Sequence, residues 1–344
     1  MIHHICYRNS GGISTYVQNL IAGSPSTQSL HLIDRPIRGQ QSTDLFHTSE
    51  RNATLVFHDP ALFRAHIGQH ESQALLALHG DNQYYYQASE EFGFISDGFL
   101  SVSSTIKSNL NHRFRSKTLV LGPCISQLNN TLARMPISLQ PKLIFIGREE
   151  ANKGVHLLPE IDKILKNKGL TPHWSIVISS RPETHINFRR WIATCSRVTL
   201  HENIPNDSLQ HFLEEHSALI LPSQTEGHPM VVIEALACGV APFTLNYCDD
   251  CASHLPKDPS GIVTPSMRHE ELALKVVQYS AQPKSKIEAW QKAALRFVLQ
   301  RHNPQIQASS LMAFVNSIEP SSKSPTRLRY HKWQRKLLRA INAW

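Results

Sequence analysis

The chain has 344 residues, of which 41% are hydrophobic, enough for the cores of two ordinary domains. No apolar run approaches the roughly 18 residues of a membrane span, and the first residues resemble a strand more than a signal peptide, so we expect a cytoplasmic protein that is not secreted. The formal net charge is +8, but residues 321–344 alone contribute +7, which leaves the body of the protein nearly neutral.

The first part of the chain alternates apolar runs with amphipathic stretches, the pattern of strands and helices in a parallel sheet. Ile13–Ala22 is predicted to form the first helix. The predicted strands are Ile2–Tyr7, Leu30–Ile33, Thr54–Phe57, Ala74–Leu78, Gly98–Val102 and Thr118–Leu121.

Glycines and histidines follow these strands. Gly11-Gly12 lies between the first strand and its helix, where the lack of side chains lets backbone approach a ligand, although a simple tight turn explains the pair equally well. His58 and His79 follow two later strands, and for His58 we favour a capping or packing role. Asp81 and the tyrosines at 84–86 are suited to contact an acceptor sugar, and packing in the core is an equal alternative for the tyrosines.

The second part repeats the alternation and predicts a second doubly wound sheet, so the fold class is α/β. Its predicted strands are Lys142–Ile146, Ser175–Ile178, Val198–Leu200, Ala218–Leu221 and Ala241–Leu245. Its predicted helices include Val155–Asn167, Asn187–Cys195, Asn206–His216, His269–Ala281, Lys284–Gln300 and Gln305–Ile318. Such sheets bind ligands at the carboxyl ends of their strands.

A loop with two cations follows the strand at 142–146. It runs from Gly147 to Gly154 and contains Arg148 and Lys153. Arginine binds a diphosphate through two hydrogen bonds and lysine as a point charge, so the pair is suited to a diphosphate. A solvated loop is the simpler explanation for this segment alone.

Two carboxylates flank a predicted helix start after the strand at 218–221. Pro229 suits the first helical position and Gly239 supplies the stop. Free N–H groups near Gly227 and His228 would face an anion. Glu226 on the loop and Glu234 on the helix can accept hydrogen bonds from hydroxyls. A ligand that carries both an anionic group and hydroxyls would be a nucleotide sugar.

This segment resembles the signature of the retaining glycosyltransferases of family 4, roughly P-S-x-x-E-G-x-P-x-x-x-x-E-A-x-A-x-G. The matching residues are Pro222, Ser223, Glu226, Gly227, Pro229, Glu234, Ala235, Ala237 and Gly239. The family's G-R-x-x-x-x-K-G loop is also kept at 147–154. The resemblance implies that Glu226 faces the donor sugar, that Glu234 holds the ribose and that Met230 belongs to the donor site. It further implies that His79 lies near the transferred sugar and Gly11-Gly12 near the donor phosphates.

The resemblance also implies the GT-B architecture, in which two Rossmann-like domains face each other across a cleft. The expected division is an acceptor domain at 1–123, a nucleotide-sugar domain at 124–302, and a helix at 303–320 that crosses back to the first domain. One departure is that residues 246–251, Asn-Tyr-Cys-Asp-Asp-Cys, replace a Gly-Gly turn and a following Glu that many relatives carry. Another is that residues 122–125, Gly-Pro-Cys-Ile, replace the usual Asn-Gly after the first domain.

The six cysteines are scattered, as expected of free thiols. Only Cys248 and Cys251 have ligand-like spacing, and His254 makes a three-ligand site formally possible. Because structural zinc sites use four ligands and no second Cys pair exists, we expect neither a metal nor another cofactor.

The tail at 321–344 predicts a basic amphipathic helix suited to an anionic membrane surface. Its apolar side gathers Tyr330, Trp333, Leu337, Ile341 and Trp344. The alternative is a helix docked on the protein's own N-terminal domain. Nucleic acid is not expected as a partner, because no recognition fold accompanies the charge.

The sequence therefore favours a retaining hexosyltransferase that uses a nucleotide diphosphate sugar. Its acceptor would be a glycan or lipid-linked saccharide of bacterial surface polysaccharide or lipopolysaccharide, reached at the inner face of the cytoplasmic membrane. The alternatives are a nucleotide-sugar epimerase of the same fold and an inactive membrane-associated binding relative.

Overall fold

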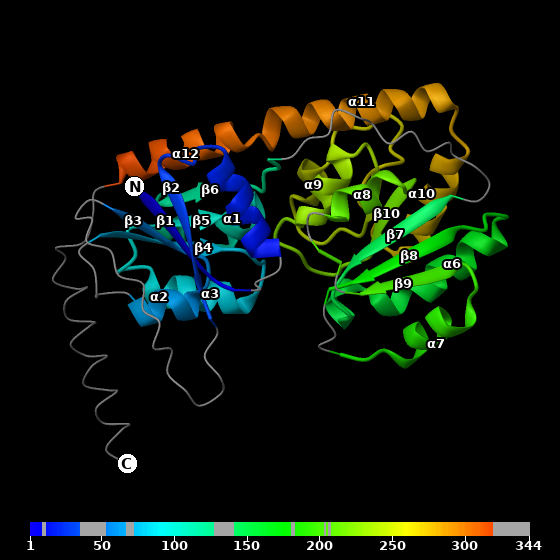
Figure 1. The fold of residues 1–344 in the computed structure, drawn as a ribbon, viewed down its shortest axis with the longest axis horizontal. Coiled ribbons are helices and arrows are strands. Elements are labelled where there is room, and N and C mark those ends of the chain that lie inside the picture. Colours follow the sequence, from blue (N-terminus) through cyan, green and yellow to red (C-terminus); the bar gives the residue numbers. More distant parts are fainter. Residues whose placement is uncertain are drawn as a thin grey trace, which may run out of the picture. The chain divides into compact units, whose positions relative to one another are not determined.

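The computed structural model describes residues 1–8, 12–34, 53–66, 72–126, 141–179, 183–202, 204–205 and 208–318. The chain divides into two compact units (Figure 1). The N-terminal unit comprises residues 1–126 and the segment from Pro304 onward, and the C-terminal unit comprises residues 127–303. The sequence places these boundaries at residues 123 and 302.

The N-terminal unit is a parallel sheet with strand order β2-β1-β3-β4-β5-β6. The order reverses between β1 and β3, so this is a doubly wound sheet. Its strands are β1 Ile2–Tyr7, β2 Gln28–Ile33, β3 Thr54–Phe57, β4 Gln73–Leu78, β5 Gly98–Ser101 and β6 Thr118–Val120. Strands β3, β4 and β5 are buried throughout, as expected of a sheet covered on both faces.

Helices cover both faces of this sheet, with α1 and α12 on one side and α2 and α3 on the other (Figure 1). The helices are α1 Gly12–Ala22, α2 Pro60–His66, α3 Gln83–Phe92, α4 Ser104–Asn109, α5 His112–Arg115 and α12 Pro304–Ser317. The last of these packs against α1 so closely that a Cβ at Gly23 would lie 2.1 Å from the Pro304 carbonyl oxygen. The Gln73 amide also donates to the carbonyls of Val315 and Ile318.

The C-terminal unit is a second parallel sheet, with strand order β11-β10-β7-β8-β9. Its strands are β7 Lys142–Gly147, β8 His173–Ile178, β9 Val198–Glu202, β10 Ala218–Leu221 and β11 Ala241–Thr244. Its α-helices are α6 Leu158–Asn167, α7 Ile186–Thr194, α8 Leu209–Glu214, α9 Met230–Ala237, α10 His269–Ser280 and α11 Lys284–Arg301. Short 3-10 turns are η1 Ala151–Lys153, η2 Val155–Leu157 and η4 Cys251–His254.

Most predicted elements agree with the structure to within two residues, but two helices are shorter than expected. The predicted helix at 155–167 starts as a 3-10 turn and becomes α-helical only at Leu158, because Pro159 lacks the N–H that would bond to the Val155 carbonyl. Helix α8 ends at Glu214, and His216 Nδ1 lies 2.5 Å from the Phe212 carbonyl oxygen.

Within the described ranges, no helix combines the length and apolarity needed to cross a membrane. The predicted amphipathic tail at 321–344 and the first glycine of the Gly11-Gly12 pair lie outside these ranges.

Candidate active site

The C-terminal sheet reverses its strand order between β7 and β10, which are hydrogen-bonded neighbours. In doubly wound sheets this switch point opens a crevice at the carboxyl ends of the strands. The loop at 148–154 follows β7 and the loop at 222–229 follows β10. The two motifs singled out from the sequence therefore meet at the edge where such a fold binds its ligand.

The two loops pack backbone against backbone. Gly154 adopts a left-handed conformation with φ 70°, and a Cβ there would lie 2.1 Å from the Pro222 carbonyl oxygen. The Gln224 N–H donates to the Asn152 carbonyl at 2.9 Å, and the Asn152 amide donates to the Thr225 carbonyl at 3.2 Å. The glycine after the lysine is thus required by this close approach.

The docked loops bring the predicted cation and carboxylate together. Lys153 Nζ lies 2.6 Å from Glu226 Oε1, and the two side chains are only 18% and 11% exposed. The two charges neutralise each other, and each holds the other in position. Arg148 is arranged differently, because its half-exposed guanidinium lies 2.7 Å from the Glu150 carboxylate.

Helix α9 starts one residue later than predicted. Pro229 is the N-cap, with an extended ψ of 123°, and its carbonyl accepts the N–H of Val232. The prediction of Pro229 at the first helical position is therefore wrong. Among the described residues, no acceptor contacts the N–H groups of Gly227, Met230 and Val231. These donors follow directly on Glu226 and can bind an anion.

Glu234 lies on the second turn of α9. Burial raises its pKa to about 7, against an ordinary value of 4.5. No donor in the described parts of the chain contacts its carboxylate. A partly buried carboxylate without donors can accept hydrogen bonds from a ligand's hydroxyls.

A second buried carboxylate in this region, that of Glu149, was not predicted from the sequence. Glu149, next to Arg148, is buried and accepts hydrogen bonds from the Arg189 guanidinium and the His185 N–H. Burial alone would raise the pKa of Glu149, but the hydrogen bonds from Arg189 and His185 and the positive charge of these side chains together outweigh it and lower the pKa. No local pattern reveals this contact, because Arg189 lies on α7, 40 residues further along the chain.

His79, in the N-terminal unit, ends a chain of hydrogen-bonded histidines. Its Nε2 lies 2.8 Å from His58 Nδ1, and His58 Nε2 lies 2.9 Å from His4 Nδ1. His4 Nε2 lies 2.8 Å from Gln28 Oε1. His58 therefore contacts His79 directly, a contact that the sequence did not indicate.

Burial keeps these rings neutral. It lowers the pKa of His79 to about 3 and that of His4 to about 4, and it lowers the pKa of His58 well below its usual value. With Gln28 Oε1 as an acceptor, each ring donates through Nε2 and accepts through Nδ1. His79 Nδ1 is then left as a hydrogen-bond acceptor at the carboxyl end of β4.

Gly12, another candidate of this unit, is the exposed first residue of α1. The remaining candidates, Asp81 and the tyrosines, have partners within the unit. The Asp81 carboxylate accepts the Tyr86 hydroxyl, and Tyr84 donates to Asp59 at 3.0 Å. Tyr85 is buried in the core. Of the predicted acceptor-binding residues, Tyr85 thus has a packing role.

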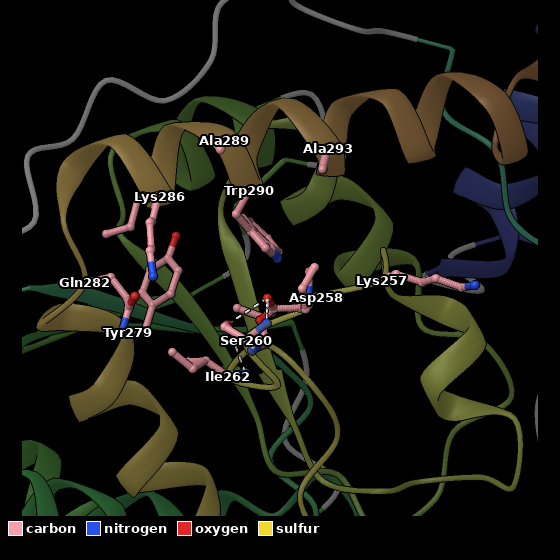
Figure 2. Close-up of a pocket in the computed structure, with 13 residues that line it drawn as sticks. Lys257, Asp258, Ser260, Ile262, Tyr279, Gln282, Lys286, Ala289, Trp290 and Ala293 are labelled. Atoms are coloured by element: carbon pink, nitrogen blue, oxygen red, sulfur yellow. Dashed lines mark hydrogen bonds between the residues drawn. The ribbon is translucent and has the colours of Figure 1, made fainter.

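A cavity of about 410 Å³ lies elsewhere in the C-terminal unit, between the loop at 257–263 and helices α10 and α11 (Figure 2). Tyr279 and Trp290 line it. The Asp258 carboxylate is occupied by its own loop, since it accepts the N–H groups of Ser260 and Val263. None of the site residues predicted from the sequence lines this cavity.

Comparison with known proteins places both motif loops within a known family segment. Residues 136–296 match the family model described as glycosyl transferases group 1. An "Uncharacterized glycosyltransferase" of Haemophilus influenzae is 26% identical over 153 residues, which make up 44% of this chain and 42% of that protein.

Solved structures share the architecture at low identity. A TarM variant from S. aureus, in complex with fondaparinux, alpha-GlcNAc-glycerol and UDP, superimposes with a TM-score of 0.63 at 14% identity, over 78% of this chain and 56% of TarM. Sucrose-phosphate synthase from Thermosynechococcus elongatus superimposes with a TM-score of 0.67 at 14% identity, over 92% of this chain and 98% of the synthase. The fold is the two-domain α/β fold of GT-B glycosyltransferases, as the resemblance predicted.

Proposed function

We propose that this protein transfers a hexose-type sugar from a nucleotide diphosphate sugar to a saccharide acceptor, with retention at the anomeric carbon. The observation that carries the proposal is the Lys153–Glu226 pair at the switch point of the C-terminal sheet. Free N–H groups at the start of α9 and the donor-free Glu234 carboxylate follow on the same segment. The family match and the UDP named for TarM support a nucleotide-sugar donor.

Each group of the site suits one part of the donor. Glu234 accepts hydrogen bonds from the ribose hydroxyls, and Glu226 accepts them from the sugar. The N–H groups of Gly227, Met230 and Val231 bind the diphosphate together with Arg148 and Lys153, and Gly147 lets backbone approach it. His79 Nδ1 can accept a hydrogen bond from a sugar hydroxyl.

The proposed reaction breaks the bond between the anomeric carbon and the diphosphate oxygen, and the electron pair leaves with the diphosphate. The acceptor hydroxyl forms the new bond on the same face, and its proton passes to a donor phosphate oxygen. Charge develops mainly on the leaving diphosphate, so its stabilisation by Lys153 and the helix start lowers the barrier. The proposal requires no catalytic metal.

The ion pair also suggests how the site responds to its donor. Before binding, Glu226 satisfies the Lys153 ammonium group, so neither charge is left unpaired. A diphosphate beside Lys153 offers a stronger anionic partner, which releases Glu226 to accept hydroxyl hydrogen bonds from the sugar. The pair thus keeps both groups positioned in the absence of substrate.

The proposed acceptor and the proposed location rest on the sequence of the tail. The basic tail at 321–344 would hold the protein at the inner face of the cytoplasmic membrane. We therefore propose a lipid-linked saccharide of bacterial surface polysaccharide or lipopolysaccharide as the acceptor.

A direct test incubates the protein with a panel of nucleotide sugars and a lipid-linked glycan extract. We expect transfer of one sugar, with the product keeping the donor's anomeric configuration by NMR. Glu234→Ala and Lys153→Ala should lose transfer, and transfer by both variants at the wild-type rate would refute the assignment. Conversion of free donor without any acceptor would instead indicate an epimerase, and donor binding without turnover would indicate an inactive relative.

A further inference from the structure

The loop after β11 gathers three metal-binding side chains: Cys248, Asp250 and His254. One ligand atom from each lies within 4.8 Å of the other two. Asp250 Oδ1 is 3.3 Å from Cys248 Sγ and 3.5 Å from His254 Nε2. Around a tetrahedral Zn²⁺ with bonds of about 2.0–2.3 Å, neighbouring ligand atoms lie about 3.3–3.8 Å apart. The distances from Asp250 to Cys248 and to His254 therefore both fit a tetrahedral ion.

The His254 side chain gives an independent indication of a ligand. It is only 2% exposed, and its Nε2 has no hydrogen-bond partner among the residues that the structure describes. Its Nδ1 lies 3.0 Å from the Tyr247 hydroxyl, and its ring stacks on His228 at 3.7 Å. An unpartnered buried nitrogen is unfavourable. A hydrogen bond on the opposite nitrogen is how metal-bound histidines are usually oriented.

The backbone holds these side chains in place. The Cys251 N–H donates to the Cys248 carbonyl at 3.1 Å, and the Ser253 N–H donates to the Asp250 carbonyl at 2.8 Å. The Cys251 thiol is hydrogen-bonded to the Cys248 thiol, and its Sγ lies 3.6 Å from the Leu245 carbonyl oxygen. The ligands thus come from one short, internally hydrogen-bonded loop.

The donor set favours zinc. A thiolate discriminates against Mg²⁺ and Ca²⁺, which prefer oxygen ligands. One thiolate, one carboxylate and one neutral imidazole balance the charge of a divalent ion, which lowers the cost of placing it in a partly buried site.

We propose that Cys248, Asp250 and His254 bind one Zn²⁺ ion, with water at the fourth position. The ion takes no part in the transfer reaction, and its binding does not depend on the proposed transferase activity. It fixes a loop that supports the donor site, because the Tyr247 carbonyl accepts the Glu226 N–H at 3.4 Å and His254 stacks on His228. No metal was expected here from the sequence, because structural zinc sites use four protein ligands.

The test uses the full chain, reduced and dialysed against Zn²⁺ or Co²⁺. We expect about one ion per chain by elemental analysis, and a near-ultraviolet thiolate-to-Co²⁺ charge-transfer band. Cys248→Ser should lose the band, and Asp250→Asn should bind Co²⁺ at least about tenfold more weakly. Tyr247→Phe, which removes only the orienting hydroxyl, should weaken binding about 10- to 100-fold.

Cys251→Ser is the matched control, because Cys251 is also buried in the same loop but is not a proposed ligand. It should keep both the ion and the band. Circular dichroism of each variant separates loss of the site from loss of the fold. The proposal is overturned by sub-stoichiometric metal in the folded wild-type chain, by a band that survives in Cys248→Ser, or by a Cys248–Cys251 disulfide whose reduction yields no metal binding.

Discussion

Replacing Glu234 by glutamine should stabilise the protein at alkaline pH and weaken donor binding. In the folded chain the Glu234 carboxyl has a pKa of about 7, whereas an ordinary glutamate has 4.5. Because the folded value is the higher one, this group destabilises the fold progressively as the pH rises from 4.5 to 7. Above pH 7 the full penalty applies, about 3 kcal/mol at 1.36 kcal/mol per pH unit.

Glutamine has a similar shape and no charge, so Glu234→Gln should behave like the protonated wild type at every pH. Urea unfolding should show the variant more stable by about 3 kcal/mol at pH 8 and by less than about 1 kcal/mol at pH 5. Glu288→Gln on α11 is the control, because that side chain is 51% exposed and should change stability little at either pH.

The proposed ribose contact adds an effect of opposite sign. Hydrogen bonds to a charged acceptor contribute about 1.5–3 kcal/mol, so Glu234→Gln should bind the donor about tenfold or more weakly at pH 8. An equal stability gain at pH 5 and pH 8, or none at pH 8, would refute the reasoning about burial. Unchanged donor affinity would refute the ribose contact alone.

Three further predictions concern the loops and the tail. Gly154→Ala should destabilise the protein by more than about 1–3 kcal/mol in thermal unfolding, since φ is positive and the Cβ would collide with the Pro222 carbonyl. The control Gly169→Ala shares the positive φ but meets nothing within 4 Å, so an equal loss there would argue against the collision. Lys153→Ala should lower kcat about 10²–10³-fold, whereas the exposed Lys163→Ala should leave it unchanged. Deleting residues 321–344 should reduce sedimentation with anionic liposomes, and undiminished binding would rule out the tail as the membrane contact.

Much of the fold could be predicted because its signals are local. Strands such as β10 are short apolar runs, and the helices between them carry their own periodicity and stop signals. The prediction of α9 was wrong at Pro229 because the φ that proline fixes suits both the N-cap and the first turn. The choice between them lies in ψ, which the sequence does not fix.

The candidate site was predicted in its residue types but not in its contacts. The two motifs indicated a cation, a helix start and two carboxylates. That Lys153 pairs with Glu226 depends on β7 and β10 being neighbours, although 73 residues separate the two side chains. The buried Glu149–Arg189 pair depends likewise on how α7 packs.

The sequence by itself determined the order of strands and helices, the position of both motif loops and the basic character of the tail. Each of these follows from residues close together in the chain. Only the tertiary structure decided which side chains meet: Lys153 with Glu226, His79 with His58 and His4, and His254 with Asp250 and Cys248. The physical reason is that strand order and backbone turns set these distances, and neither is encoded in the spacing of residue types.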